Sequence, residues 1–407
     1  MRLFQAALLF ALTCAFFPAQ ASAQASASPQ DGAQDALTGT GTEAERPRGG
    51  VRETAPGAAQ PTQAEEAVST GSGFALNPQL FGYVKAGYFL VLPMSEDSQI
   101  GSNSGFQLIN ARLGLTLRPA EMLEATVSID GAVQRRDVGD PLRGERIVAL
   151  RDAYLEFTPY EFLRIRAGQF KAPFNAETLL PDNALPFITR SVLTQGILPP
   201  EGPVQEGLTL DRQVGVQLSS ARLGGKVGFE YAVAVVNGNG ANELFNDNNS
   251  IAPVARLALS YDSLLSIGVN GFYNVLSLGA APRITETQLA YGGDVTLVTG
   301  GLHAMGMFLV RSVGHPDTDL PTEEGMGALG QVRYHFESLG LEAGARVAWY
   351  QPSGALAFAE RTEITGMVGY RAARIPARIL IQYTHRIEDA AVEIGNNSVD
   401  LLGQVTF

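Results

Sequence analysis

The sequence predicts an all-β protein: a transmembrane antiparallel β-barrel of about 16 strands with a long, inward-folded third loop. Apolar and polar residues alternate along most segments after residue 74, and this period of two places alternate side chains on opposite faces of a strand. Short and long connections also alternate along the chain. Bacterial barrels join an even number of strands in this way, with short turns at one end and long loops at the other.

Composition narrows the class of protein further. Only 17% of the residues are charged, the net charge is −12, and there is a single cysteine. After the N-terminus no apolar run reaches the roughly 18 residues of a membrane helix. The acidic balance argues against a nucleic-acid partner, which needs a basic footprint. Composition therefore disfavours a helical membrane protein, a disulfide scaffold and a nucleic-acid binder.

The N-terminal part predicts export. Residues 1–23 resemble a signal peptide, with Arg2 before an apolar stretch and small residues at Ala21 and Ala23. Residues 24–73 are rich in Ala, Gln, Pro and Gly and cannot bury enough apolar surface to fold, so we expect a disordered periplasmic lead. Residues 74–407 are expected to form the barrel.

The expected strands follow from the alternation. In 109–117, for example, Ile109, Leu113 and Leu115 share an apolar face, expected to meet lipid. Arg112 and Thr116 lie on the opposite face. The same reasoning predicts sixteen segments: 79–92, 105–118, 122–135, 147–158, 161–170, 211–220, 226–237, 252–262, 264–276, 286–299, 301–313, 325–337, 340–351, 361–372, 376–387 and 397–407.

Aromatic residues and the last segment support the same fold. Aromatics lie mostly toward segment ends, where a membrane barrel has its two girdles; they include Tyr88, Tyr154, Phe157, Tyr261, Tyr291, Tyr334, Phe336, Trp349, Tyr350 and Tyr383. The final segment alternates apolar residues and ends in Phe407. It resembles the signal that the barrel-assembly machinery reads on bacterial outer-membrane proteins.

The third long connection, roughly 171–210, carries a family resemblance. At its start is the stretch Gly168-Gln169-Phe170-Lys171-Ala172-Pro173-Phe174. The connection contains Phe187-Ile188-Thr189-Arg190-Ser191, and it is followed by Asp211-Arg212-Gln213-Val214-Gly215-Val216. These stretches resemble the phosphate-selective porin O and P family. The resemblance implies an outer-membrane porin that forms a homotrimer, with this loop narrowing the channel. Two departures concern phosphate selectivity: Thr189 stands where the family usually has Glu, and the loop has one lysine, Lys171.

The polar face of each strand is expected to line the lumen. Its basic residues, together with those of the third loop, are the candidate pore-lining and anion-guiding groups: Lys85, Arg112, Arg164, Arg166, Lys171, Arg190, Arg256, Arg333, Arg346 and Arg378. Inward carboxylates are also expected, including Glu124, Asp130, Glu230, Glu342 and Asp400. Some arginines are therefore expected to pair across strands, and the alternatives are anion preference, near-neutral selectivity and cation preference.

Catalytic and metal-binding patterns are scarce. His303, His315, His335 and His385 lie on different segments without metal-ligand spacing, so we expect no metal, no cofactor and no enzyme. The alternatives are an outer-membrane barrel hydrolase, using His385 with Asp389 or His335 with Ser338, and a secreted soluble β-protein that acts as a binding module. The expected partners are outer-membrane lipid and lipopolysaccharide, the assembly machinery, and small hydrophilic solutes or anions.

Overall fold

The computed structural model describes residues 68–69, 75–92, 104–136, 144–197, 205–243, 245–279, 282–352, 360–389 and 396–407. The predicted signal peptide (1–23) and nearly all of the predicted lead (24–73) lie outside these residues. Within the lead, Val68–Ser69 forms the short strand β1, which pairs antiparallel with Ala75 and Leu76.

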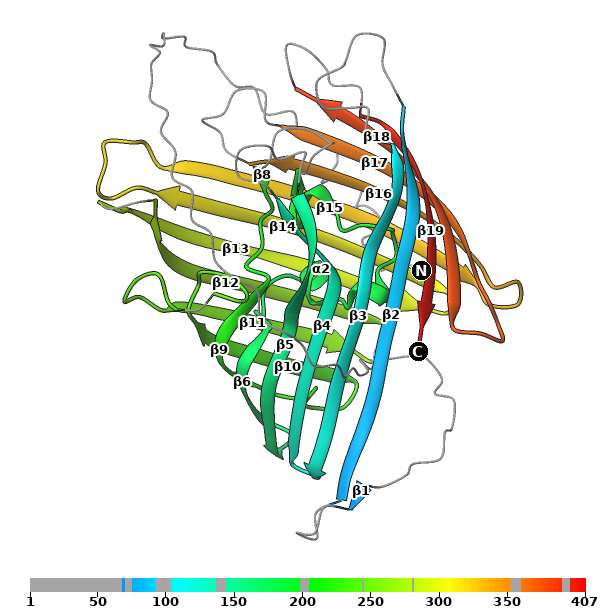
Figure 1. Ribbon diagram of the computed structural model, residues 1–407, viewed down its shortest axis with the longest axis horizontal. Coiled ribbons are helices and arrows are strands. Elements are labelled where there is room, and N and C mark those ends of the chain that lie inside the picture. The colour runs from blue at the N-terminus through cyan, green and yellow to red at the C-terminus, as the bar shows by residue number, and fades with distance from the viewer. Residues whose placement is uncertain are drawn as a thin grey trace. The chain divides into compact units, whose positions relative to one another are not determined.

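Sixteen antiparallel strands form one closed ring (Figure 1). They are β2 (Ala75–Val91), β3 (Gly105–Ala120), β4 (Leu123–Arg136), β5 (Gly144–Tyr160), β6 (Leu163–Lys171), β9 (Arg212–Ser219), β10 (Val227–Val236), β11 (Ala252–Tyr261), β12 (Leu265–Leu278), β13 (Ile284–Thr299), β14 (Leu302–Gly314), β15 (Glu323–Phe336), β16 (Leu341–Gln351), β17 (Arg361–Arg371), β18 (Ala377–Glu388) and β19 (Ser398–Thr406).

Each strand pairs with the next, β6 pairs with β9, and β19 pairs with β2 to close the ring. The predicted barrel is therefore confirmed, and all sixteen predicted segments correspond to these strands. The differences are confined to a few residues at strand ends. Closure follows from the membrane environment, because an open edge in lipid would leave backbone N–H and C=O groups without partners.

The alternation of side chains between the two faces is also confirmed. In β16, Glu342, Arg346 and Tyr350 are buried inside the ring, whereas Leu341 and Val347 are exposed on the outside. Exposed apolar side chains occur in this way on strands all around the barrel. Such an apolar outer surface is what a lipid environment requires.

Connection lengths differ between the two ends of the barrel, as predicted. Two-residue turns at 121–122, 161–162 and 300–301 lie at one end, and longer connections such as 237–251 and 315–322 lie at the other. The C-terminal residue is at the end with the short turns, where Phe407 and Gly82 exchange backbone hydrogen bonds of 2.8 and 2.9 Å.

Exposed aromatic side chains form pairs near the short turns. The rings of Tyr160 and Phe162 stack at 5.0 Å, and those of Tyr334 and Phe336 meet edge-on at 4.7 Å. Two of the aromatics predicted for the girdles are instead inside the barrel. Tyr154 lies under the guanidinium of Arg166, and Tyr350 is fully buried, because both occupy inward positions of their strands.

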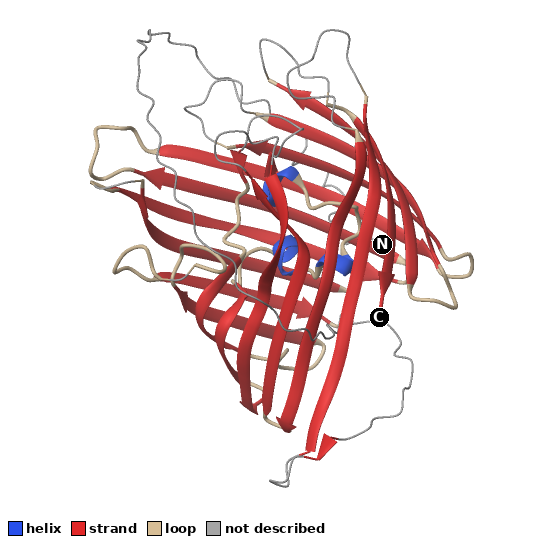
Figure 2. Ribbon diagram, in the orientation of Figure 1, coloured by secondary structure: helices blue, strands red, loops and turns tan. Residues whose placement is uncertain are grey.

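The long connection from β6 to β9 contains small elements of its own. These are α2 (Ala176–Leu179), the 3₁₀ helix η1 (Asp182–Ala184), α3 (Val192–Gln195), and the two-stranded hairpin of β7 (Gly196–Ile197) and β8 (Gln205–Glu206). Figure 2 shows the short helices in blue among the red strands. Within the described ranges, no helix is both long enough and apolar enough to cross a membrane.

The two faces of β11 provide a test of the barrel's orientation toward lipid. Leu257 is 46% exposed on the outer face, whereas its neighbour Ala258 faces inward, directly opposite Glu230 of β10. Leu257→Arg is expected to lower the free energy of unfolding in lipid vesicles by about 2–4 kcal/mol, because it places a charge in hydrocarbon. Ala258→Arg gains a cross-strand carboxylate and is expected to be tolerated. Equal destabilisation of both variants in urea titrations would contradict the assignment of faces.

Ring closure provides a second test, at Phe407. A Cβ atom on Gly82 would meet the Phe407 ring at 2.5 Å, so the ring lies directly over this glycine. Phe407→Asp removes the apolar contact at the closing pair of strands and is expected to reduce the yield of folded, heat-modifiable barrel on gel electrophoresis. Phe407→Tyr keeps the ring and serves as the control. Normal yield of the Asp variant would show that this contact does not contribute to closure.

Candidate functional site

The β6–β9 connection is anchored inside the barrel, first by apolar packing. Phe174 and Leu193 of the connection are fully buried in a cluster with inward side chains of the wall. Gly327 of β15 makes room for this contact, because a Cβ atom there would meet Leu193 Cδ1 at 2.3 Å. The wall residues of the cluster are Phe170, Ala234, Val236, Ala252, Val254, Phe272, Ala290, Met305, Met307, Leu309, Leu329, Ala348 and Tyr350.

This cluster corrects the prediction that the inner face is polar throughout. From β10 to β16 much of the inner face that contacts the connection is apolar, because it forms a hydrophobic core with it. The sequence carries a signal for this sector. In β10 both Val233 and Val235 on the outer face and Ala234 and Val236 on the inner face are apolar, so alternation gives way to a continuous apolar run.

A second, smaller apolar cluster corrects the predicted direction of one more side chain. Ile109 was expected on the lipid face, but it packs against the inner cluster that contains Phe187 and Ile188 of the connection. The register of β2 and β3 shifts between Lys85 and Ala86. A bulge of this kind inserts one unpaired residue and re-aims a side chain, here Ile109.

Wall side chains also hold the connection by hydrogen bonds to its backbone near β2 and β18. Lys85 Nζ donates to the carbonyls of Asp182 and Ile188, at 3.2 Å each. Gln382 Oε1 accepts from the backbone N–H of Ile188 at 3.0 Å. These two side chains provide hydrogen-bond partners for backbone groups that burial would otherwise leave without partners.

Further anchors come from β18 and β16. Arg378 donates to the carbonyls of Leu185 at 2.7 Å and Pro186 at 2.8 Å, and the Tyr350 hydroxyl donates to the carbonyl of Glu206. The connection is therefore fixed to strands far from β6 and β9 in the ring, on the other side of the barrel from its own ends.

Ten ionisable residues surround the contact between the connection and strands β2 to β6 and β9. We call them the central charge cluster. Its members are Lys85, Arg112, Arg151, Lys171, Arg190, Arg212, Asp130, Asp152, Asp182 and Asp211.

Asp152 is the carboxylate that joins two of the wall arginines of this cluster. It pairs with Arg112 of β3 and lies 2.9 Å from Arg212 Nε of β9, and Ser128 Oγ donates to it at 3.0 Å. Both guanidinium groups are almost completely buried. Buried charges of this kind are stable only when paired, so removal of one partner leaves the other at a high energetic cost.

Asp182 is the corresponding carboxylate on the connection. Arg190 Nη2 lies 2.7 Å from it and Arg112 Nη1 lies 3.7 Å away. Burial alone would raise the pKa of Asp182, but the positive charges of Arg190, Lys171 and Arg212 outweigh it and hold the pKa well below the ordinary range. Asp182 is therefore ionised at neutral and mildly acidic pH.

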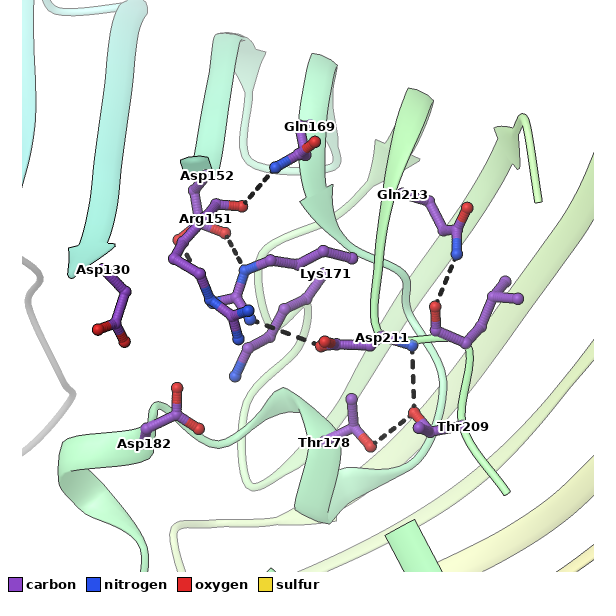
Figure 3. Close-up of polar contacts among 12 residues, drawn as sticks. Asp130, Arg151, Asp152, Gln169, Lys171, Thr178, Asp182, Thr209, Asp211 and Gln213 are labelled. Atoms are coloured by element: carbon purple, nitrogen blue, oxygen red, sulfur yellow. Dashed lines mark hydrogen bonds and ion pairs between the residues drawn. The ribbon is translucent and has the colours of Figure 1, made fainter. Parts of the chain in front are cut away.

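Figure 3 shows how the remaining members are placed: Arg151 and Lys171 extend from the wall toward the space between Asp182 and Asp211. Lys171 Nζ donates to the carbonyl of Leu180 at 2.6 Å, and Asp211 lies 3.5 Å from the Arg212 guanidinium. The connection and the wall thus present charges of both signs to one region.

Arg151 and Asp152 are functional candidates that sequence reasoning missed. Strict alternation would send one of these consecutive residues into lipid. The pairing of β4 with β5 shifts between Ser128 and Ile129, so that Arg151 has no partner residue on β4 and both side chains face inward. An Arg-Asp pair inside a predicted strand is the signal that could have indicated such a bulge.

The other predicted pore-lining arginines mostly pair with carboxylates of neighbouring strands. Arg166 lies 2.6 Å from Glu156, and Arg256 makes two contacts of 2.5 and 2.7 Å with Asp294. Asp294 was not among the predicted carboxylates, although its position in β13 is inward. These ion pairs join strands of the wall to one another.

Three arginines share one carboxylate at the short-turn end. Glu342 lies 2.6 Å from Arg378, 2.9 Å from Arg371 and 3.9 Å from Arg333. The half-buried Arg164 lies opposite Ser219 of β9. Of the ten predicted basic residues, the structure therefore brings Lys85, Arg112, Lys171 and Arg190 together in the central charge cluster and distributes the others around it.

A cavity of about 320 Å³ adjoins the cluster on the side of β5, β6, β9, β10 and β11. Lys171, Arg212 and Asp152 of the cluster line it, together with the inward residues Tyr154, Arg166, Gln217, Ser219, Glu230 and Arg256 of the wall and Pro173 and Leu179 of the connection. Its lining combines charged, neutral polar and apolar groups.

Comparisons with known proteins agree with this architecture. The family model described as phosphate-selective porin O and P matches residues 84–282. No curated protein sequence matches the chain. Among solved structures, the chain is similar to an anion-selective porin from Comamonas acidovorans, with a TM-score of 0.57, 12% identity, and coverage of 82% of this chain and 100% of that one.

Two further solved structures show the same fold. The outer membrane channel DcaP of Acinetobacter baumannii has a TM-score of 0.57 at 15% identity, with 84% of this chain and 99% of that one covered. The trimer form of the outer membrane protein OmpT of Vibrio cholerae has a TM-score of 0.51 at 11% identity, with 82% and 99% covered. The resemblance predicted from the sequence is thus confirmed: the chain is a bacterial outer-membrane porin that matches the phosphate-selective porin O and P family over residues 84–282.

Proposed function

We propose that this porin is a passive channel for small hydrophilic solutes with a mild preference for anions, and that the β6–β9 connection forms its constriction. The observation that carries the proposal is the balance of the central charge cluster, in which six basic residues face four acidic ones beside the cavity of about 320 Å³. Rings of charged side chains select ions by sign in this way.

Ion pairing explains why the preference is expected to be mild. Arg112 and Arg212 share Asp152, and Arg190 pairs with Asp182, so much of the positive charge is compensated locally. At physiological salt, charges are screened beyond about 8 Å, and only groups next to the passing ion contribute strongly. The predicted basic residues outside the cluster are expected to contribute less, because most of them pair with carboxylates of their own.

Phosphate remains one candidate among the anions. The match to the family model supports it. Within the resemblance, the side chain expected as Glu is Thr189, whose backbone carbonyl accepts a hydrogen bond from Arg346 at 2.8 Å. Carboxylates and phosphates both suit arginine's planar donors, so we propose the broader class of small anions as solutes.

We also propose a homotrimer. One of the similar structures is described as a trimer form. On the outer face of β3 to β6, a shallow apolar groove is lined by Leu115, Leu117, Ala125, Val127, Ala153, Leu155 and Ala167. Small side chains such as these alanines allow close approach of a neighbouring membrane protein.

The remaining partner and export proposals rest on the sequence. We propose that residues 1–23 direct export, that residues 24–73 form the lead and 74–407 the barrel, and that Phe407 serves as a signal to the assembly machinery. Acidic side chains of the long loops, such as the exposed Asp319 and Glu324, are proposed to meet lipopolysaccharide. Glu388, in contrast, is engaged by Arg361 and Asn396.

A hydrolase is the weaker candidate. Its proposed site used His385 with Asp389 or His335 with Ser338. In the structure, His385 Nδ1 shares a hydrogen bond with Asn397 Oδ1 at 3.1 Å, which gives the imidazole an amide and not a carboxylate as its partner. We therefore propose that the protein is not an enzyme and that transport is its function.

Removal of two cluster cations tests the proposed selectivity. Arg112→Ala combined with Lys171→Ala leaves Asp152 and Asp182 less compensated, so the chloride-over-potassium preference is expected to disappear or reverse. The measurement is the reversal potential of single channels across a tenfold KCl gradient. The control removes the same amount of charge at the short-turn end of the barrel, with Arg118→Ala and Lys226→Ala, and should leave the reversal potential unchanged. A cation-selective wild-type channel, or an unchanged double variant, would contradict the proposal.

The lowered pKa of Asp182 predicts how the constriction responds to acid. A carboxylate with a depressed pKa stabilises the fold above its unfolded value, about 3.9, and loses this contribution as the pH falls through its folded value. The difference in urea-unfolding midpoint between wild type and Asp182→Asn is therefore expected to stay constant from about pH 7 to pH 5 and to shrink only in stronger acid. Shrinkage already near pH 6 would show that Asp182 is not held by these cations.

A further inference from the structure

Glu177 is a buried carboxylate within the β6–β9 connection that is not a member of the central charge cluster. It is 1% exposed. Its carboxylate accepts hydrogen bonds from the backbone N–H of Ser191 at 2.9 Å, from Ser191 Oγ at 2.5 Å and from Thr194 Oγ1. Glu177 lies in α2, and Ser191 and Thr194 lie at the start of α3, so this one carboxylate joins the two helices of the connection.

Arg346 of β16 joins the same part of the connection to the wall. Its Nη1 donates to the carbonyl of Thr189 at 2.8 Å and lies 3.9 Å from Glu177 Oε1. Its guanidinium carbon is 4.7 Å from the centre of the Phe187 ring. Arg346 is 2% exposed. The charges of Arg346 and Glu177 are thus close together and excluded from water. Removal of one leaves the other buried without its partner, which strongly destabilises the fold.

Between these attachment points the chain presents the charges that face the passage. Arg190 donates to the carbonyls of Glu177 and Leu180 and pairs with Asp182. The segment 180–190 therefore starts at the residue next to α2 and ends at the residue before the N-cap of α3. Both of its ends are fixed by Glu177, and its position against the wall is fixed by Arg346.

We propose that Glu177 and Arg346 are a positioning pair that sets how far Asp182 and Arg190 project into the passage, and so sets conductance and ion preference without contacting the solute. The inference deepens the proposed function and rests on it. Because buried, well-packed arrangements switch between discrete states more readily than they deform gradually, loss of the pair is expected to release the segment into alternative positions.

Glu177→Gln, Arg346→Gln and the double variant test the pair in planar bilayers. Each single variant is expected to increase open-channel current noise, to change single-channel conductance, and to shift the reversal potential in a KCl gradient. The double variant is expected to shift these no further than a single one, because interacting residues are not additive. Arg346→Lys keeps the charge next to Glu177 and is expected to restore part of the wild-type behaviour. Additive effects, or variants identical to wild type, would overturn the proposal.

The matched control is Glu363→Gln. Glu363 is also a buried carboxylate, 4% exposed, and pairs with Arg386 Nε at 3.1 Å, but the pair joins β17 to β18 within the wall. It is expected to leave noise, conductance and selectivity unchanged. An equal effect from this control would mean that any buried ion pair of the barrel acts on the current, and would overturn the specific role of Glu177.

A milder variant keeps the proposal testable if Glu177→Gln does not yield heat-modifiable barrel. Ser191→Ala removes one donor to Glu177 and leaves the charge pair in place, so a smaller change in the same direction is expected. Wild-type noise and conductance in this variant would overturn the proposal. Failure of the proposed function is distinguishable, because the wild-type barrel would then form no channels, or the Arg112→Ala/Lys171→Ala channel would keep its reversal potential.

Discussion

Backbone hydrogen bonding in lipid is the constraint on which the rest of this structure depends. No water is available there to satisfy an open strand edge, so β19 has to pair with β2 and every strand has to keep both neighbours. Once the ring is closed, side chains can point only outward or inward. Alternation then assigns Val347 to lipid and Arg346 to the interior, and it places most of the charged side chains of the wall.

The interior that results is divided between two kinds of surface. From β10 to β16 the wall and the β6–β9 connection share a hydrophobic core that includes Phe174 and Leu193. Toward β2 and β3 the same connection meets Lys85 and Arg112. Apolar packing thus holds one side of the connection and leaves its charged side for the hydrated part of the lumen. The connection is therefore part of the core of the protein, held by contacts along its length as well as by its two ends.

Charge pairing decides how such an interior acts on ions. An arginine count alone would suggest a strong preference for anions, but Arg166, Arg256 and Arg378 each lie beside a carboxylate that compensates them. What remains is the small excess of basic groups where the connection meets the wall. A porin can therefore carry many inward arginines for mechanical reasons, while a few of them determine selectivity.

The sequence by itself determined the sixteen strands, their order of short and long connections, and most of the inward and outward faces, because these depend on a local period of two and on turn length. Only the tertiary structure decided which charges meet. The bulges that turn Arg151 and Ile109 inward break the period without changing composition, and the contacts of Arg346 with Thr189 and Glu177 join residues far apart in the chain. Such contacts depend on ring closure and on the path of the connection, and neither of these is encoded in any local pattern.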